Sequence, residues 1–257
     1  MGQVIAIANQ KGGVGKTTTA ATLGTALAER GKRVLLVDMD PQGALSATLG
    51  IDGDNLQTSI YNALMSLDVR LEDIIFEIRP GLHLIPSNID LASAEMDLIP
   101  EIGRETILRD LLQPLAKGYD YTLIDTPPNL GLLTINVLTA ADSVLIPIQC
   151  EFLAMRGMRL ILMTINKIKA KHNPRLEILG ILPTMFNART VHAREVLQEL
   201  RSVFGQKVFE LVIRDSVKFA EAPVIHQTIL EYAKNHEGAK AYRELAEVVI
   251  RGTKGKP

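Results

Sequence analysis

Residues 10–18, QKGGVGKTT, combine glycines, lysines and threonines at the spacing of a phosphate-binding loop. The ordinary pattern is G-x-x-x-x-G-K-[ST], and Gly15, Lys16 and Thr17 match its end. The first glycine of the pattern is missing, and a second lysine, Lys11, stands beside the gap. The sequence therefore predicts a nucleotide-phosphate site with an additional cation.

Each residue type in this loop has a predicted part in binding. Backbone N–H groups of a glycine-rich turn bind anions, and the helix that follows adds a partial positive charge. Lys16 is expected to reach the terminal phosphates, and the Thr17 hydroxyl is expected to ligate Mg²⁺. The alternative is that the glycines only turn a strand into a helix. The lysine and threonine between an apolar run and a helix argue against it.

Three aspartates follow apolar runs that read as strands. Asp125 ends the run 121–124, and Asp38 and Asp40 follow the run 34–37. Ligands bind at the carboxyl ends of parallel strands, so these carboxylates should converge with the glycine loop. We expect Asp125 and Asp38 to serve Mg²⁺, and Asp40, on a turn, to position an attacking water. The alternative for both Asp38 and Asp40 is a structural role as a capping or strand-end carboxylate.

Short apolar runs alternate with helical patterns along the chain, and these elements must position the site. A helix is predicted from about residue 16 to 30, with Gly31 as its stop, and others over about 152–171 and 190–203. Buried strands separated by helices indicate a single α/β domain over residues 1–257. We expect a doubly wound, mostly parallel sheet with helices on both faces. The predicted strands are 4–8, 34–37, 82–86, 121–124, 144–148, 178–182 and 208–213.

The composition excludes several kinds of protein. The chain of 257 residues, 47% hydrophobic, can bury a substantial core. Cys150 is the only cysteine, which excludes an internal disulfide, and the five scattered histidines predict no zinc or transition-metal centre. The first apolar run lacks the length and basic flank of a signal peptide, and no run approaches the about 18 residues of a membrane span. We expect a cytoplasmic protein that does not bind membranes.

Three segments together resemble the deviant Walker A ATPases of the ParA/MinD superfamily, in the same order along the chain: KGGVGKTT, LLVDMDPQG and LIDTPP. The sequence is most similar to the ParA/Soj partition ATPases, in their small form without an N-terminal DNA-binding domain. The resemblance runs nearly end to end and includes the later segments NART, EAP and GAKAY. It implies a P-loop NTPase fold of the deviant Walker A type.

The resemblance also implies a mechanism. The family binds ATP with Mg²⁺ and forms a homodimer that holds two nucleotides face to face. Lys11 would cross to the partner's phosphates, where a cation supplied in trans stabilises charge only in the closed dimer. Asp40 would orient the attacking water. The predicted catalytic residues are Lys11, Lys16 and Asp40, the metal-binding residues are Thr17, Asp38 and Asp125, and the nucleotide-binding residues are Lys11, Gly12, Gly13, Val14, Gly15, Lys16, Thr17 and Thr18.

Charge is divided unevenly along the chain. Residues 1–150 hold 10 Lys and Arg against 18 Asp and Glu, a net charge of −8, and residues 151–257 carry +7. A basic half suggests a polyanionic partner, although the two halves could instead pair with each other.

Because the family binds DNA without sequence preference as an ATP dimer, Arg189 and Lys218 are predicted DNA contacts. They match arginines of the Soj subgroup, the second being lysine here; the alternative for each is a solvated surface charge. The resemblance further implies a nucleoid-associated protein with a ParB-like activator or cargo adaptor.

This chain departs from the subgroup near the expected nucleobase site. The subgroup usually reads I-P-R-N-V-R-L-S-E-A-P, where this chain has IRDSVKFAEAP from Ile213. Arg214 replaces proline and Asp215 replaces arginine, and the following S-x-G-K-P becomes VIHQT, residues 224–228. These departures concern adenine recognition and the DNA surface, and they leave chromosome, plasmid and protein cargos open.

Three other classes of protein share parts of this pattern. A MinD-like membrane-cycling ATPase would carry a basic, Phe- and Leu-rich C-terminal helix, and the end of this chain has no Phe. A nitrogenase-iron-protein-like reductase would need two cysteines per subunit. A metabolic P-loop enzyme, such as a small-molecule ligase, can share Lys11 but not the C-terminal resemblance. DNA binding that requires ATP would separate the partition function from that third class.

Overall fold

A computed structural model describes residues 2–65, 68–151 and 153–254. Within them, the strands form one seven-stranded sheet in the order β3-β4-β2-β5-β1-β6-β7. Every neighbouring pair is parallel except β3 and β4. The strands are β1 (Gln3–Ile7), β2 (Val34–Asp38), β3 (Phe76–Arg79), β4 (Leu82–Ile85), β5 (Tyr121–Asp125), β6 (Ser143–Gln149) and β7 (Glu177–Thr184).

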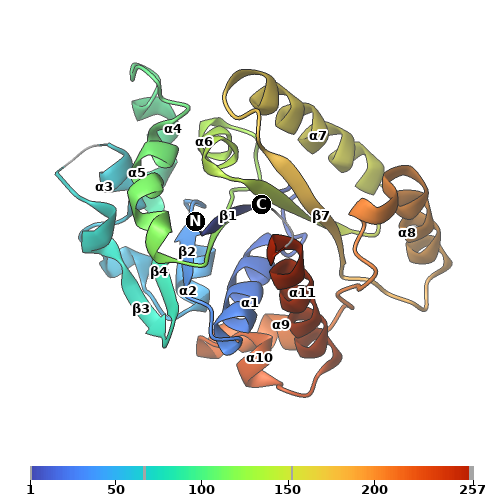
Figure 1. Cartoon of the computed structure of the whole chain (residues 1–257). Helices are drawn as coiled ribbons and strands as arrows, with labels where there is room; N and C mark the ends of the chain where they lie inside the picture. Colours follow the sequence, from blue (N-terminus) through green and yellow to red (C-terminus); the bar gives the residue numbers. More distant parts are fainter. Residues whose placement is uncertain (1, 66–67, 152, 255–257) are drawn as a thin grey trace.

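Helices cover both faces of this sheet (Figure 1). One layer contains α3 to α8, and the other contains α1, α2, α10 and α11. The expected doubly wound α/β fold is therefore confirmed. The helices are α1 (Lys16–Glu29), α2 (Ala44–Thr48), α3 (Ile60–Leu64), α4 (Ala94–Asp97), α5 (Ile107–Leu115), α6 (Leu132–Ala140), α7 (Ala154–Lys171), α8 (Val191–Phe204), α9 (Lys218–Glu221), α10 (Ile229–Tyr232) and α11 (Glu237–Lys254).

The apolar runs of the central strands divide their side chains between the two layers. In β1, Val4 and Ala6 join the layer of α3 to α8, while Ile5 and Ile7 join the layer of α1 and α11. This alternation follows from the two-residue period of a strand, and burial on both faces explains why the runs are almost entirely apolar, with Thr122 as an exception.

The carboxyl ends of the central strands lie level with one another. Asp38 of β2 is opposite Asp125 of β5, and Asp125 is opposite Ile7 of β1. The glycine loop leaves β1 at the same edge and leads into α1. The predicted convergence of the aspartates and the loop is therefore confirmed at the level of the backbone.

Two sequence expectations about strands were wrong. Residues 208–213 do not form a strand; isolated bridges join Val208 to Ile181 and Arg214 to Phe186. The segment follows the outer edge of β7, where Pro183 has no N–H to donate and breaks a continuous ladder. The edge strand β3, which pairs antiparallel with β4, was not predicted, since FEIR is short and only half-buried.

The predicted helical boundaries agree with the structure to within a few residues. α1 covers Lys16–Glu29, and Gly31 adopts the left-handed conformation (φ 72°) expected of a helix stop. α7 and α8 correspond to the predictions at 152–171 and 190–203, although residue 152 lies outside the described residues. None of the described helices is long and apolar enough to span a membrane.

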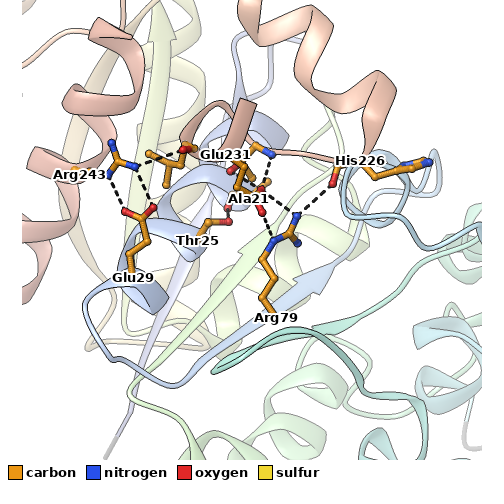
Figure 2. Close-up of polar contacts among 9 residues, drawn as sticks. Ala21, Thr25, Glu29, Arg79, His226, Glu231 and Arg243 are labelled. Atoms are coloured by element: carbon orange, nitrogen blue, oxygen red, sulfur yellow. Dashed lines mark hydrogen bonds and ion pairs between the residues drawn. The ribbon is translucent and has the colours of Figure 1, made fainter. Parts of the chain in front are cut away.

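Ion pairs and hydrogen bonds join the C-terminal segment of the chain to its first third (Figure 2). Arg79 of β3 donates to the Glu231 carboxylate of α10 and to the His226 carbonyl. Arg243 of α11 donates to Glu29 of α1, with Nε 2.7 Å from the carboxylate. His226 has a left-handed backbone (φ 55°) where the subgroup has glycine, and its Nδ1 lies 2.9 Å from the Ala47 carbonyl of α2.

Candidate nucleotide-binding site

Two hydrogen bonds of the Asn9 side chain fix the course of the loop between β1 and α1. The Asn9 side chain donates to the Pro147 carbonyl (2.7 Å) and accepts from the Lys11 amide (3.0 Å). Gly13 and Gly15 have positive φ angles of 71° and 85°, which glycine adopts without strain. The turn therefore presents backbone N–H groups at the start of α1, as anion binding requires.

Lys16, the first residue of α1, is buried at 6% exposure within this loop. Its Nζ donates to the Lys11 carbonyl over 3.4 Å, a long contact that a phosphate oxygen can replace. Burial lowers its pKa, while the nearby carboxylates of Asp125 and Asp40 raise it. A buried cation at the centre of an anion-binding turn is suited to the terminal phosphates of a nucleotide.

Asp125 is a buried carboxylate whose ligand-binding capacity is unused. Neither of its oxygens has a hydrogen-bond partner of ordinary geometry among the described residues, although the Thr17 hydroxyl lies close enough to lower its pKa. Burial and the neighbouring Asp38 raise its pKa to about 8, and Thr17 and Lys16 act in the opposite direction. Because an orphaned buried carboxylate is costly, its free oxygens beside Thr17 fit an oxygen-binding cation such as Mg²⁺.

Asp38 is held by the chain itself. Its Oδ2 accepts from the Ser46 amide (2.8 Å) and hydroxyl (2.7 Å) of α2, and its Oδ1 accepts from the Asp40 amide (3.2 Å). Burial raises its pKa to about 6, and these hydrogen bonds limit the shift. Asp38 thus supports α2 at the site, and Asp125 has the oxygens free for a metal.

Asp40 occupies the turn between β2 and α2. Its Oδ1 accepts the Gln42 amide (3.0 Å), and its side chain is largely buried at the edge of the site. None of the described residues donates a hydrogen bond to the other carboxylate oxygen, Oδ2, so this oxygen can accept one from a water. This position is compatible with the predicted water-orienting role.

Lys11, in contrast, points away from its own loop. Its Nζ lies 2.7 Å from Glu151 and 3.0 Å from Gln149, beyond the end of β6. The side chain is 42% exposed. The two lysines of the motif therefore differ in environment: Lys16 is enclosed by the loop, and Lys11 lies at the surface in an ion pair. No local pattern in the sequence indicates Glu151 as the partner of Lys11.

A cavity of about 390 Å³ opens beside the loop. One wall is the segment around Arg214 and Asp215, where this sequence differs from the Soj subgroup. Phe219 and Tyr242 add aromatic surface. The size and the apolar lining suit a nucleobase next to the phosphate loop. The lining residues are Gly15, Thr18, Thr184, Met185, Ile213, Arg214, Asp215, Ser216, Val217, Phe219, Ala220 and Tyr242.

The two predicted DNA contacts differ in their surroundings. Arg189 is exposed, and in the described part of the chain it has no ion-pair partner. Its neighbour across a polar hollow is Arg214, which pairs with Glu237. Lys218 is bound to Glu221 (2.7 Å) and lies over the Tyr232 ring, so its charge is largely neutralised. Arg189 is the better placed of the two for a phosphate.

Comparison with known proteins identifies the family. A model described as AAA domain matches residues 2–178. The chain is 46% identical to the sporulation initiation inhibitor protein Soj of Bacillus subtilis, covering 97% of this chain and 98% of Soj. It is 45% identical to the chromosome partitioning protein ParA of Myxococcus xanthus, covering 100% and 91%. The chain belongs to the ParA/Soj family of P-loop ATPases.

Solved structures similar to this ParA/Soj-family chain contain nucleotides. A protein of Mycobacterium smegmatis described as cobyrinic acid a,c-diamide synthase, with bound ADP and magnesium, is 42% identical and has a TM-score of 0.88, covering 99% of this chain and 96% of that one. A putative plasmid partition protein from Borrelia burgdorferi B31, bound to AMPPNP, is 26% identical, with a TM-score of 0.81 and coverage of 98% of this chain and 99% of that one.

A second family model matches residues 132–256 and describes 4Fe-4S iron sulfur cluster binding proteins of the NifH/frxC family. A cluster shared between two subunits takes two cysteine ligands from each. Cys150 is the only cysteine in the sequence, and it is buried at the end of β6. The match therefore reflects the shared fold, and the chain lacks the ligands for such a cluster.

Proposed function

We propose that this chain is an ATP-driven switch that positions or segregates a cargo. It binds ATP with Mg²⁺, closes into a homodimer and binds DNA without sequence preference. It returns to the monomer by slow hydrolysis, stimulated by a ParB-like partner or cargo adaptor. The convergence of the glycine loop, buried Lys16 and the unpartnered carboxylate of Asp125 at one edge carries the nucleotide part of this proposal.

The residues of the loop divide the work of binding. The backbone of Gly12, Val14 and their neighbours surrounds the phosphates, Lys16 neutralises them, and Thr18 reaches the α-phosphate. Thr17 and Asp125 would hold Mg²⁺, which neutralises charge on the phosphate oxygens when bound. Solved relatives with ADP or an ATP analogue and magnesium support this assignment.

The switch itself depends on Lys11. A cation that is exposed and outside its own phosphate loop can reach a second nucleotide, and a phosphate there would compete with Glu151. ATP binding would then favour the dimer because only the dimer completes the charge balance. Asp40, at the edge of the site, would orient the water that attacks the terminal phosphate.

DNA binding is supported by the net charge of +7 over residues 151–257 and by the unpaired Arg189. The test is binding of the protein to two duplexes of unrelated sequence, with and without Mg²⁺-ATP, at several salt concentrations. We expect equal affinity for both duplexes, only with ATP, that falls as salt rises. Binding that ignores nucleotide would contradict the switch.

A matched pair of variants assigns the surface. Arg189→Glu should weaken DNA binding about tenfold or more at fixed salt while the ATP-dependent dimer persists. Arg175 is also exposed and lies in the basic half, but it precedes β7 at the amino ends of the strands. Arg175→Glu should therefore have little effect on DNA binding. Equal losses in the two variants would indicate a diffuse charge effect without a defined contact.

A second candidate function comes from the similar structure described as a diamide synthase. An amide synthase that takes nitrogen from glutamine needs a nucleophile to open the glutamine amide. Cys150 does not supply one, because burial raises the pKa of its thiol to about 11. ATP turnover that requires ammonia and a carboxylic acid, and not DNA or a protein partner, would favour this second function.

A further inference from the structure

Two exposed surfaces of opposite charge flank the nucleotide loop on the same layer of helices. The first, here the acidic segment, covers residues 89–102 from the end of β4 through α4. The second, here the basic helix, is α7 with the preceding Leu153. Both pack their apolar sides on the same core layer and turn other side chains outward.

The acidic segment carries apolar side chains that its own fold leaves uncovered. Ile102 is fully exposed and Met96 is 72% exposed, and Ile89 and Ile99 are more than half exposed. The same stretch has four acidic residues and no lysine or arginine: Asp90, Glu95, Asp97 and Glu101. Exposed apolar groups among charges of one sign are typical of a protein-binding surface.

The basic helix has the opposite character. α7 contains no acidic residue and five cations, and Leu153 and Met163 are about half exposed beside them. In the described part of the chain, none of these cations has an ion-pair partner. The cations are Arg156, Arg159, Lys167, Lys169 and Lys171.

Their places in the sheet set how two copies can meet. The acidic segment starts after β4 and the basic helix after β6, so both begin at the carboxyl edge, on opposite sides of β1 and its loop. Consider a two-fold axis that is perpendicular to the sheet and lies at the carboxyl ends of its strands. This axis places the β4 side of one copy against the β6 side of its partner. Such an axis makes the same contact twice.

We propose that the acidic segment of one copy binds the N-terminal half of the basic helix of a second copy of this chain. Ile89, Met96 and Ile102 would meet Leu153 and Met163, while Asp97 and Glu101 would face Arg156 and Arg159. The contact rests on the proposed ATP dimer and names the surfaces that hold it together outside the nucleotide site. It assigns Asp97 and Glu101 of the acidic half and Arg156 and Arg159 of the basic half to recognition between copies, and leaves the other cations of residues 151–257 to DNA.

The test is the dimer dissociation constant in the presence of Mg²⁺ and a non-hydrolysable ATP analogue, measured by sedimentation velocity. Arg156→Glu with Arg159→Glu places like charges in both contacts and should weaken the dimer about tenfold or more. Asp97→Lys with Glu101→Lys should do the same. Binding of a fluorescent nucleotide by each monomer checks that the fold survives.

A mixture of these two double variants gives the sharpest outcome. A chain whose two surfaces are both acidic and a chain whose two surfaces are both basic repel themselves but complement each other in a mixed pair. We expect mixed dimers close to the wild-type affinity. Lys171→Glu is the matched control, because it reverses one charge on the same helix about 18 Å or more from Arg159, and it should leave the dimer unchanged.

Three results would overturn the proposal. If the wild-type chain dimerises with nucleotide and the charge reversals do not change the dimer dissociation constant, the proposed contact is wrong but the proposed dimer is not. Loss of DNA binding with intact dimerisation in Arg156→Glu, Arg159→Glu would assign the helix to nucleic acid. A wild-type chain that stays monomeric with nucleotide at every accessible concentration would overturn both the contact and the dimer on which it rests.

Discussion

At the scale of single residues, the motif separates two lysines that are close in sequence. Lys16 is enclosed by the glycine loop and faces Asp125, whereas Lys11 leaves the loop and pairs with Glu151. The positions differ because α1 begins at Lys16 and fixes its direction, while Lys11 precedes the turn. Lys16 is therefore placed to bind the nucleotide of its own subunit, and in the proposed dimer Lys11 would be available to the second subunit once its ion pair breaks.

The ion pair of Lys11 yields a prediction about the dimer. Glu151→Gln removes the charge that holds Lys11 to its own subunit, so the ATP-dependent dimer should form at lower protein concentration. The gain should be less than roughly 30-fold, because the dimer contains two such pairs and an exposed ion pair contributes about 1 kcal/mol or less. Light scattering with Mg²⁺ and a non-hydrolysable analogue measures it.

Glu199→Gln, on the exposed face of α8, is the control for this change. It removes the same charge from the same half of the chain, far from Lys11, and should leave the dimer unchanged. A weaker dimer in Glu151→Gln would mean that the carboxylate contributes to the closed state and does not compete with it.

The raised pKa of Asp125 predicts that Mg²⁺ binding depends on pH. Burial and Asp38 raise the pKa of its carboxyl to about 8, and a metal ligand must be ionised. The affinity for Mg²⁺-ATP should therefore rise with pH and level off above about pH 8, and Asp125→Asn should weaken binding and flatten the profile. Calorimetry between pH 6 and 8.5 in two buffers also detects the released proton. A flat wild-type profile would contradict the assignment.

The same shift affects the free protein in the opposite direction. A carboxyl with a raised folded-state pKa contributes stability at low pH, and this contribution is lost as the pH rises through the folded value. For Asp125 the loss extends to about pH 8, and for Asp38 to about pH 6. Mg²⁺ and nucleotide should therefore stabilise the protein most at the alkaline end.

At the scale of elements, the Ser46 hydroxyl of α2 connects this helix to two neighbouring parts of the site. Ser46 is fully buried, donates to Asp38 and accepts the Ser87 amide, so it joins β2 to the loop after β4. Asp40 lies on the turn between β2 and α2. Any movement of α2 would therefore move the residue predicted to orient the water.

Removal of this hydroxyl should reduce both stability and turnover. Ser46→Ala leaves a buried amide without its acceptor and takes a donor from Asp38, and we expect a loss of about 1–3 kcal/mol in the free energy of unfolding. Urea denaturation measures the loss. Thr48→Ala removes a hydroxyl of the same helix that bonds only its own turn, and its effect should be smaller. Equal effects would show that Ser46 has no special role.

The sequence predicted those elements whose residues carry a strong local pattern. The strands that hold the aspartates and the helix after the glycine loop were found because buried parallel strands and glycine stops have clear signatures. β3 and the path of residues 208–213 were not predicted. The conformation of a segment at the edge of a sheet depends on its pairing with the adjacent strand, which the local sequence does not report. The contacts of Lys11 with Glu151 and of Asp38 with Ser46 depend on tertiary placement, which no local pattern reports.

At the scale of the whole molecule, the cavity proposed to bind the nucleotide joins parts of the chain that are far apart in sequence. Its cavity is lined by Gly15 and Thr18 from the start of the chain, and by Phe219 and Tyr242 from near its end. α1 and α11 also pack against each other, with the Tyr242 hydroxyl 2.9 Å from Thr19. A bound nucleotide should therefore stabilise the complete fold, well beyond the loop itself.

This linkage predicts a concentration-dependent thermal shift. Mg²⁺-ATP at about 100 times its dissociation constant should add about 2.7 kcal/mol to the stability of the native state. Lys16→Ala should fold but show no shift, and it should lose ATP turnover. Scanning fluorimetry over a series of nucleotide concentrations measures the shift. Wild-type turnover by Lys16→Ala would contradict the assignment of the phosphate site.

The pairing of the first helix with the last has a further consequence for synthesis. The phosphate loop, residues 10–18, is synthesised more than 200 residues before Phe219 and Tyr242. A nascent chain therefore carries a phosphate loop without the walls of its base pocket. The cavity is therefore complete only after Tyr242 has been synthesised, and a chain truncated before that residue should bind nucleotide more weakly than the complete chain.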